Sequence, residues 1–167
     1  MTTPLHRALR TFIFFAIFLI AGCASVQRAE SPLTQETTHW QGRLALKVLS
    51  TPAQAFSANF ELDGSAQAGS LTLSTALGST LARMQWSPGM AVLQTSGETR
   101  GFGSLNAMVK EIIGTDLPVA GLFSWLQGNN TTSPPWEADL SDLANGRLTA
   151  RRMAEPNPAE LKILLDR

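Results

Sequence analysis

Residues that favour a buried face alternate with polar residues along four runs between residues 43 and 86. The inward positions of these runs are Leu44, Leu46 and Val48, then Phe56, Ala58, Phe60 and Leu62, then Leu71, Leu73 and Thr75, and finally Thr80, Ala82, Met84 and Trp86. A period of two is typical of antiparallel strands with one buried and one solvated face. Turn residues at Asp63-Gly64-Ser65 and Ser87-Pro88-Gly89 separate the runs, and Met90 to Thr95 adds a further strand. The pattern predicts five consecutive strands in a meander.

Two stretches after this meander have helical spacing instead. Ser104 can cap a helix that ends near Ile113, just before the terminator Gly114. Pro118 can open a second helix that runs to about Gln127. Its large apolar residues fall mainly on one side, and they are Leu122, Phe123, Trp125 and Leu126. We therefore expect two short helices between the strands.

Alternation returns in the last part of the chain. It predicts strands over residues 136–140, 147–153 and 160–165, and Asn145-Gly146 is a hairpin signal before the second of them. About eight strands and two or three short helices indicate a mainly β protein. A single curved antiparallel sheet wrapped over the helices would hide its apolar face, and an incompletely filled concavity would be an apolar pocket.

The chain begins with a short hydrophobic run. Arg7 and Arg10 precede an uncharged run over residues 11–22, about half the roughly 20 residues that a membrane-spanning helix needs. This arrangement is typical of a signal peptide, which we place at residues 1–22. The segment Leu19-Ile20-Ala21-Gly22-Cys23 resembles the bacterial lipobox, which predicts cleavage before Cys23 and lipidation of its thiol. The alternative is an ordinary signal peptide cut at Gly22 or Ala24, which leaves a free thiol.

A lipidated Cys23 would carry two chains by thioether and one by amide, which makes an effectively permanent anchor. Residues 23–38 are polar and have no apolar period, so we expect them to be the lipidated terminus and a flexible tether. Residues 39–167 have the usual size of one domain. Inner-membrane lipoproteins generally carry aspartate after the cysteine, but here Ala24 and Ser25 follow it. The sorting rule therefore predicts an anchor on the periplasmic side of the outer membrane.

The mature chain lacks most residues that common catalytic sites need. The chain has 13 basic residues, and the signal peptide contains two of them. The mature chain therefore has 11 basic and 13 acidic residues, and this charge balance does not favour binding to nucleic acid. His39 is then the sole histidine, and lipidation uses the one cysteine. No G-x-S-x-G elbow occurs, and Gly101-Phe102-Gly103 stops short of a phosphate-binding fingerprint. Glu137, Asp139 and Asp142 form a loose acidic cluster typical of a solvated loop. We expect no enzyme activity, no cofactor and no metal.

Several segments together resemble the LolB family of outer-membrane lipoproteins. They are the lipobox ending at Cys23, Trp40-Gln41-Gly42-Arg43-Leu44, Thr75-Ala76-Leu77-Gly78-Ser79-Thr80, and Gly114-Thr115-Asp116-Leu117-Pro118 leading into Leu122-Phe123-Ser124-Trp125-Leu126. The resemblance covers the whole mature chain. It implies an unclosed β-barrel with an α-helical lid or plug and a hydrophobic cavity for acyl chains. It also implies a monomeric acceptor that takes triacylated lipoproteins from a LolA-like periplasmic carrier and inserts them into outer-membrane lipid without nucleotide hydrolysis.

The resemblance implies a specific role for Leu77, an exposed leucine on a protruding loop that puts cargo into the membrane. The residues alone favour another interpretation. Leu77 lies beside Gly78 in a hairpin that is ordinarily polar, and a leucine tucked under its own turn is the more common arrangement. Ala76 stands where many relatives have proline, so we expect a less rigid loop than theirs.

Alternation and helical spacing also select candidates for the cavity wall. They are Leu46, Val48, Phe56, Phe60, Leu71, Leu73, Met84, Trp86, Leu122, Phe123 and Leu126. Each of these positions is equally compatible with dry core. Arg83, Arg151 and Arg152 are candidates to meet the carrier or lipid phosphates, although scattered arginines are more often solvated. The alternative function is a structural or assembly lipoprotein whose apolar face binds a protein partner.

Overall fold

The computed structural model describes residues 38–114 and 116–166. In this part of the chain every strand belongs to one sheet. The strands are β1 (Thr38–Val48), β2 (Gln54–Gly64), β3 (Gly69–Ser74), β4 (Thr80–Ser87), β5 (Met90–Thr95), β6 (Thr99–Phe102), β7 (Trp136–Asp139), β8 (Arg147–Arg152) and β9 (Ala159–Leu165). The predicted signal peptide, Cys23 and the tether up to residue 37 lie outside the described residues and stay predictions.

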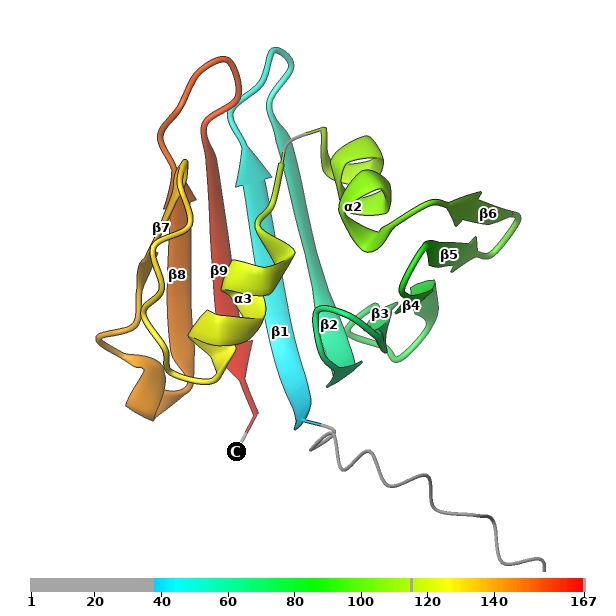
Figure 1. Ribbon diagram of the computed structural model, residues 1–167, viewed down its shortest axis with the longest axis horizontal. Coiled ribbons are helices and arrows are strands. Elements are labelled where there is room, and N and C mark those ends of the chain that lie inside the picture. Colours follow the sequence, from blue (N-terminus) through cyan, green and yellow to red (C-terminus); the bar gives the residue numbers. More distant parts are fainter. Residues whose placement is uncertain (1–37, 115, 167) are drawn as a thin grey trace, which may run out of the picture. The chain divides into compact units, whose positions relative to one another are not determined.

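The sheet has nine strands in the order β6-β5-β4-β3-β2-β1-β9-β8-β7, and neighbouring strands run antiparallel. The last strand, β9, pairs with the first, β1, so the meander β1–β6 and the hairpins β7–β9 join in the middle of the sheet (Figure 1). Because β6 and β7 are its two edges, the sheet curves without closing. The predicted mainly β fold, with one unclosed antiparallel sheet and helices, is confirmed.

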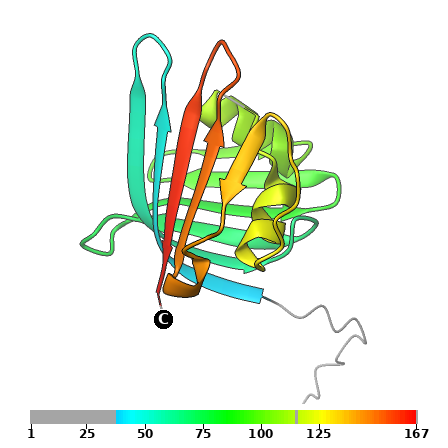
Figure 2. The same ribbon diagram turned by 90° about the vertical axis from the view of Figure 1, so that its left-hand side faces the viewer.

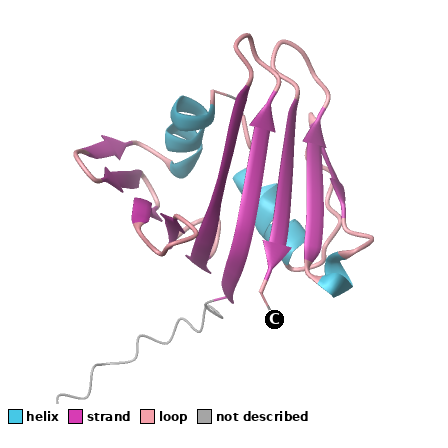
Figure 3. Ribbon diagram, turned by 180° about the vertical axis from the view of Figure 1, so that it is seen from behind, coloured by secondary structure: helices cyan, strands magenta, loops and turns pink. Residues whose placement is uncertain are grey.

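The register places the alternating residues on the expected faces. In β1 and β2, Leu44 pairs with Ala58 and Leu46 pairs with Phe56, so their side chains share the face toward the helices. We call this the inner face and the opposite one the outer face. Figure 3 shows the outer face of the central strands, with α3 (Val119–Leu126) visible behind them. Along β1 the outer positions are all exposed, which is the alternation that the sequence predicts.

Both α-helices follow the predicted boundaries. In α2 (Leu105–Ile113) the Ser104 hydroxyl accepts a hydrogen bond from the Ala107 N–H at 3.1 Å. Gly114 ends this helix with φ +73°, a left-handed conformation that glycine adopts without steric cost. The second helix, α3, begins after Pro118 and crosses the inner face of the sheet (Figure 2). None of the helices among the described residues is long and apolar enough to span a membrane.

Aromatic side chains hold α3 and its flanking loops on the sheet. The Phe123 ring packs edge-on against Trp40 and Trp86, with ring centroids 5.7 and 6.4 Å apart. The buried indole N–H of Trp125 donates to the Thr131 carbonyl at 2.9 Å, and that of Trp136 to the Asp116 carbonyl at 2.6 Å. These bonds fix the segments before and after α3, so the helix is a plug held at both ends.

Two local features differ from the sequence prediction. Strand β6 was not predicted, because its four residues, Thr-Arg-Gly-Phe, are too few to show alternation. It exists through its pairing with β5. Asn145-Gly146 does reverse the chain before β8, but not as a two-residue hairpin. A short 3-10 helix, η1 (Leu143–Asn145), makes the connection, and the Gly146 N–H donates to the Leu143 carbonyl.

Candidate functional site

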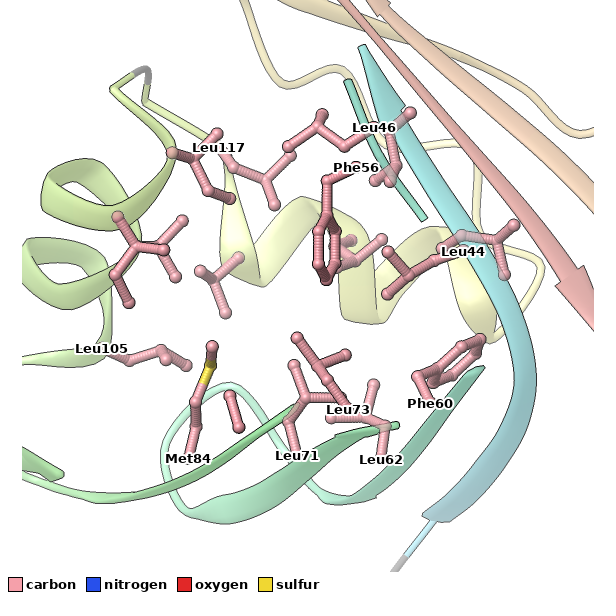
Figure 4. Close-up of a pocket in the computed structure, with 18 of the residues that line it drawn as sticks. Leu44, Leu46, Phe56, Phe60, Leu62, Leu71, Leu73, Met84, Leu105 and Leu117 are labelled. Carbon is pink, nitrogen blue, oxygen red and sulfur yellow. The ribbon is translucent and has the colours of Figure 1, made fainter. Parts of the chain in front are cut away.

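An apolar cavity of about 470 Å³ lies between the inner face of the sheet and the two helices. Its size falls within the range of about 300–1,000 Å³ that is usual for ligand sites. Gln54 and Thr95 are the only polar side chains among the described residues that line it. Figure 4 shows leucines from β1, β3, α2 and the α2–α3 linker pointing into the same space. Such a wall suits an aliphatic ligand and offers almost nothing to a charged one.

All eleven residues selected from the sequence as cavity candidates line this cavity. They come from β1 (Leu46, Val48), β2 (Phe56, Phe60), β3 (Leu71, Leu73), β4 (Met84, Trp86) and α3 (Leu122, Phe123, Leu126). The fold thus brings together side chains that are up to 80 residues apart in the chain. They border unfilled space on one side, unlike residues of a close-packed core.

The cavity wall also includes residues that the sequence reasoning did not select. They are mainly Leu105, Val109, Ile112 and Ile113 from α2, Leu117 from the linker, and Leu161 and Ile163 from β9. Their helical or period-two spacing was visible in the sequence. What was missing was the placement of α2 on the inner face and of β9 beside β1, which depends on contacts distant in sequence.

Partly exposed residues mark where the cavity opens. Phe56, Ile112 and Leu81 line the cavity and yet are exposed by 42, 41 and 38%. Phe56 belongs to the start of β2, Ile112 to the end of α2, and Leu81 to the start of β4. A chain entering between these elements would meet apolar side chains first and the buried Phe60 and Met84 farther in.

The side chain of Leu77 is 96% exposed. It lies in the turn between β3 and β4, where Thr75 makes most of the hydrogen bonds. The Thr75 carbonyl accepts from Gly78 N–H at 2.9 Å, its hydroxyl accepts from Ser79 N–H at 3.1 Å, and its N–H donates to Ser79 O at 2.9 Å. A leucine tucked under its own turn is therefore excluded. These bonds hold the turn in a conformation that presents Leu77 to solvent.

The three candidate arginines do not form one site. Arg151 points to the outer face and pairs with Glu160 at 2.9 Å. Arg152, its neighbour in β8, bonds instead to the backbone carbonyls of Ala154 and Asn157 in the β8–β9 loop. Arg83 is exposed on β4, on the other arm of the sheet. Arg152 thus orders its own loop, and only Arg83 and Arg151 present charge to solvent.

The acidic cluster consists of solvated carboxylates, although Glu137 and Asp139 lie on β7 and only Asp142 lies in the loop that the sequence predicted. A hydrogen bond from the Ser141 hydroxyl, at 2.6 Å, lowers the pKa of Asp139. Hydrogen bonds from Asn145 and Arg147 lower the pKa of Asp142. A carboxyl group that serves as general acid needs a raised pKa, so these shifts run in the wrong direction for that role. Within residues 38–114 and 116–166, no group of three His, Cys, Asp or Glu side chains could hold a metal ion.

Comparisons with known proteins agree on one family. Residues 37–155 match the family described as Outer membrane lipoprotein LolB. The chain is similar to the outer-membrane lipoprotein LolB of Bordetella petrii, with 34% identity over 77% of this chain and 66% of that relative. For the protein of the same name from Bordetella pertussis the identity is 32%, over 70% of this chain and 60% of the relative. For that of Shewanella baltica it is 28%, over 75% and 71%. The chain thus spans about 60% of the length of the Bordetella pertussis relative.

Proposed function

The chain belongs to the outer membrane lipoprotein LolB family, and on this basis we propose that it is an acceptor and insertase for lipoproteins. It is anchored to the outer membrane through Cys23, receives triacylated lipoproteins from a LolA-like periplasmic carrier, and holds their acyl chains in the inner-face cavity. It then places them in outer-membrane lipid. The names of the relatives, which are outer-membrane lipoproteins, support this location.

The observation that carries this proposal is the cavity itself. Its wall is apolar, it is only partly filled, and it opens past Phe56, Ile112 and Leu81. A module that binds a folded protein partner would present an exposed apolar surface instead. The exposed Leu77, on a separate loop, supplies the apolar group that would enter the membrane.

Transfer by this route needs no nucleotide. Burying acyl chains contributes roughly 0.8 kcal/mol per CH₂, so complete burial of three chains would exceed the practical affinity ceiling of about 18–21 kcal/mol. A cavity of about 470 Å³ therefore leaves much of the cargo lipid incompletely buried. A bilayer buries all of it, which makes the step from cavity to membrane favourable.

An in vitro transfer assay tests the proposal. The periplasmic carrier is loaded with a labelled triacylated lipoprotein, and the chain from Ala24 onward is added without nucleotide. We expect the label to move to this chain, and then to vesicles when these are supplied. If the label stays on the carrier while circular dichroism shows the chain to be folded, the acceptor function is wrong. The protein would then be an assembly lipoprotein whose apolar face binds a protein partner.

A further inference from the structure

The outer face of the sheet, opposite the cavity, carries a cluster of cations. Six of the nine Lys and Arg residues among the described residues lie there. Arg83 lies apart from the others on β4, and we call the other five the basic face: Arg43 and Lys47 of β1, Lys162 of β9, and Arg147 and Arg151 of β8. The strand order β1-β9-β8 makes them neighbours. The described residues as a whole have more acidic than basic side chains, so this concentration of positive charge is local.

Few carboxylates neutralise the basic face. Glu160 accepts from both Lys162, at 2.8 Å, and Arg151, at 2.9 Å, and it is also the cross-strand partner of Lys47. One carboxylate therefore pairs with two cations and lies opposite a third. Asp142 pairs with Arg147 at 3.1 Å, while no described side chain forms an ion pair with Arg43 or Lys47. Glu137 of β7 is in addition the register partner of Arg151, so the excess of positive charge lies at Arg43, Lys47 and Lys162.

An apolar residue lies in the middle of the basic face. Leu164 of β9 is the register partner of Arg43 on one side and of Arg147 on the other, and its side chain is 43% exposed. A shallow depression of about 310 Å³ farther along β1 is lined by Lys47, Lys162 and Glu160, among others. Lysine and arginine side chains around an exposed leucine suit the interface of a membrane, where cations can contact the headgroups and leucine can contact the acyl chains.

The basic face is continuous with the loop that carries Leu77. Arg43 pairs in register with Asn59 of β2, and the Asn59 side-chain amide donates to the Thr75 carbonyl at 3.3 Å. Arg43 and Asn59 both lie on the outer face of the sheet. Figure 2 shows the β3–β4 loop extending past β2 on the side away from α3, which is the side of the basic face. The apolar tip and the cations can therefore meet the same surface.

Acidic residues border the basic face and restrict how it can lie. Glu137 and Asp139 occupy the outer positions of the edge strand β7, and Glu61 and Asp63 occupy those at the far end of β2. An anionic surface attracts the centre of the face and repels these borders. The charge distribution thus favours one orientation of the sheet.

We propose that the basic face binds the headgroups of anionic phospholipids while Leu77 enters the bilayer. This inference rests on the proposed function, and it adds a second membrane contact and an orientation to it. The outer face of β1, β9 and β8 lies on the membrane, and the cavity on the inner face stays accessible from the periplasm. Charge complementarity and continuity with the Leu77 loop identify the occupant as an anionic membrane surface.

The test uses the lipidated full chain reconstituted in vesicles, so that every variant carries the same anchor. Ser57→Cys places a fluorophore on the outer face, and Asn106→Cys places one on α2 as a matched control. Lipids with a nitroxide headgroup quench a label that touches the membrane. In phosphatidylethanolamine vesicles we expect quenching at position 57 with phosphatidylglycerol and at least threefold less with phosphatidylcholine. Because salt screens exposed charges, raising the salt to about 0.5 M should remove most of the difference.

Charge reversal identifies the residues responsible. One Lys or Arg near an anionic surface changes an equilibrium about fivefold, so Lys47→Glu with Lys162→Glu should weaken membrane contact at position 57 by about 25-fold or more. Arg100→Glu with Lys110→Glu makes the same change in net charge near β6 and α2 and should have little effect. Equal quenching on both lipids, or an equal loss in the two double variants, would overturn the proposal.

A parallel measurement without vesicles separates this inference from the proposed function. The Lys47→Glu and Lys162→Glu double variant should still take labelled cargo from the carrier, because neither side chain lines the inner-face cavity. If cargo uptake falls while quenching at position 57 is unchanged, the basic face docks an acidic protein and the membrane assignment is wrong. If the unaltered chain does not take cargo from the carrier but shows lipid-dependent quenching, the proposed function is wrong. The assignment of the basic face as a membrane contact is then still supported.

Discussion

Substituting Leu77 should change the insertion of cargo without changing the stability of the fold. Because its side chain is 96% exposed, replacing it leaves the core and the cavity wall unchanged. Leu77→Glu replaces an apolar group that favours the bilayer with a charge that opposes entry. We predict normal uptake of cargo from the carrier and at least tenfold slower insertion into vesicles, measured as transfer of a labelled lipoprotein.

A second exposed apolar residue provides the control for that experiment. Met90 is the first residue of β5, is 56% exposed, and lies beside a different turn, the one between β4 and β5. Met90→Glu makes the same type of substitution and should insert cargo at the normal rate. Normal insertion by Leu77→Glu would contradict the role of this loop, whereas an equal defect in both variants would point to a general effect of added negative charge.

His39 is a residue with a predictable titration. Its Nδ1 lies 2.7 Å from Oδ1 of Asp63 across β1 and β2, and this hydrogen bond raises the pKa of His39 above the ordinary 6.5. A raised folded-state pKa means that the pair contributes stability below pH 6.5 and loses it as pH rises through the folded pKa. The pair is exposed, so the effect on stability is small.

NMR titration of the imidazole measures this shift directly. In the chain from Ala24 onward His39 is the sole histidine, so its signals need no assignment. We predict a pKa above the ordinary 6.5 and a lower pKa in Asp63→Asn, because the acceptor charge is removed. Asp116→Asn should leave the titration unchanged, because Asp116 pairs with Lys110 and not with His39. A pKa insensitive to Asp63→Asn would show that the pair does not form in solution.

Among the elements, α2 depends on an identifiable cap. The Ser104 hydroxyl satisfies the Ala107 N–H, and the helix that follows places Leu105, Val109 and Ile113 against the cavity. Removing such a cap typically costs about 1 kcal/mol. We predict that Ser104→Ala lowers the free energy of unfolding by about that amount in urea, without a change in m value. Ser104→Asp should restore most of it, because aspartate caps equally well.

A serine outside any helix serves as the reference for this substitution. Ser96 is exposed in the turn between β5 and β6, so Ser96→Ala should change stability by less than about 0.5 kcal/mol. An equal cost at both positions would mean that the loss at Ser104 does not come from capping.

At the scale of the whole molecule, the cavity is the property to test. Ala82 of β4 lines it and pairs with Leu73, so Ala82→Phe would place a ring in the empty volume. We predict at least tenfold weaker binding of a fluorescent long-chain fatty acid, with the fold retained. Ala45→Phe adds the same ring on the outer face of β1 and should bind normally.

Thermal unfolding measures ligand binding in the same cavity independently. A ligand at about 100 times its dissociation constant stabilises the folded state by about 2.7 kcal/mol. The fatty acid should therefore raise the melting temperature of the unaltered chain and of Ala45→Phe, and raise that of Ala82→Phe much less. Equal shifts in all three proteins would place the ligand outside the inner-face cavity.

Much of this architecture was readable from the sequence because the signals are local. Period-two alternation in residues 44–86 predicts strands whatever they pair with, and Ser104 and Gly114 bound α2 through bonds within a few residues. The same locality accounts for the cavity candidates, since an inward position in a strand is known once its neighbours are known. The motif around Leu77 similarly identified the loop before its conformation was known.

The tertiary structure decided what depends on contacts between distant residues. Pairing of β1 with β9 joins positions more than 110 residues apart, and it explains Gly42 in the opening motif. A Cβ at Gly42 would lie 2.0 Å from the Leu164 carbonyl oxygen, and its φ of +155° also disfavours a side chain. That pairing also gathers Arg43, Lys162 and Arg147 on one face.

The sequence by itself thus determined the first five strands of the meander, the two α-helices, the inward-facing residues and the family. Only the tertiary structure decided that the inner face stays partly empty, that Leu77 is exposed, and that the cations gather on the opposite side. The physical reason is that propensity and alternation act between near neighbours. Unfilled volume, exposure and surface charge are instead sums over elements brought together by β1, β9 and α3.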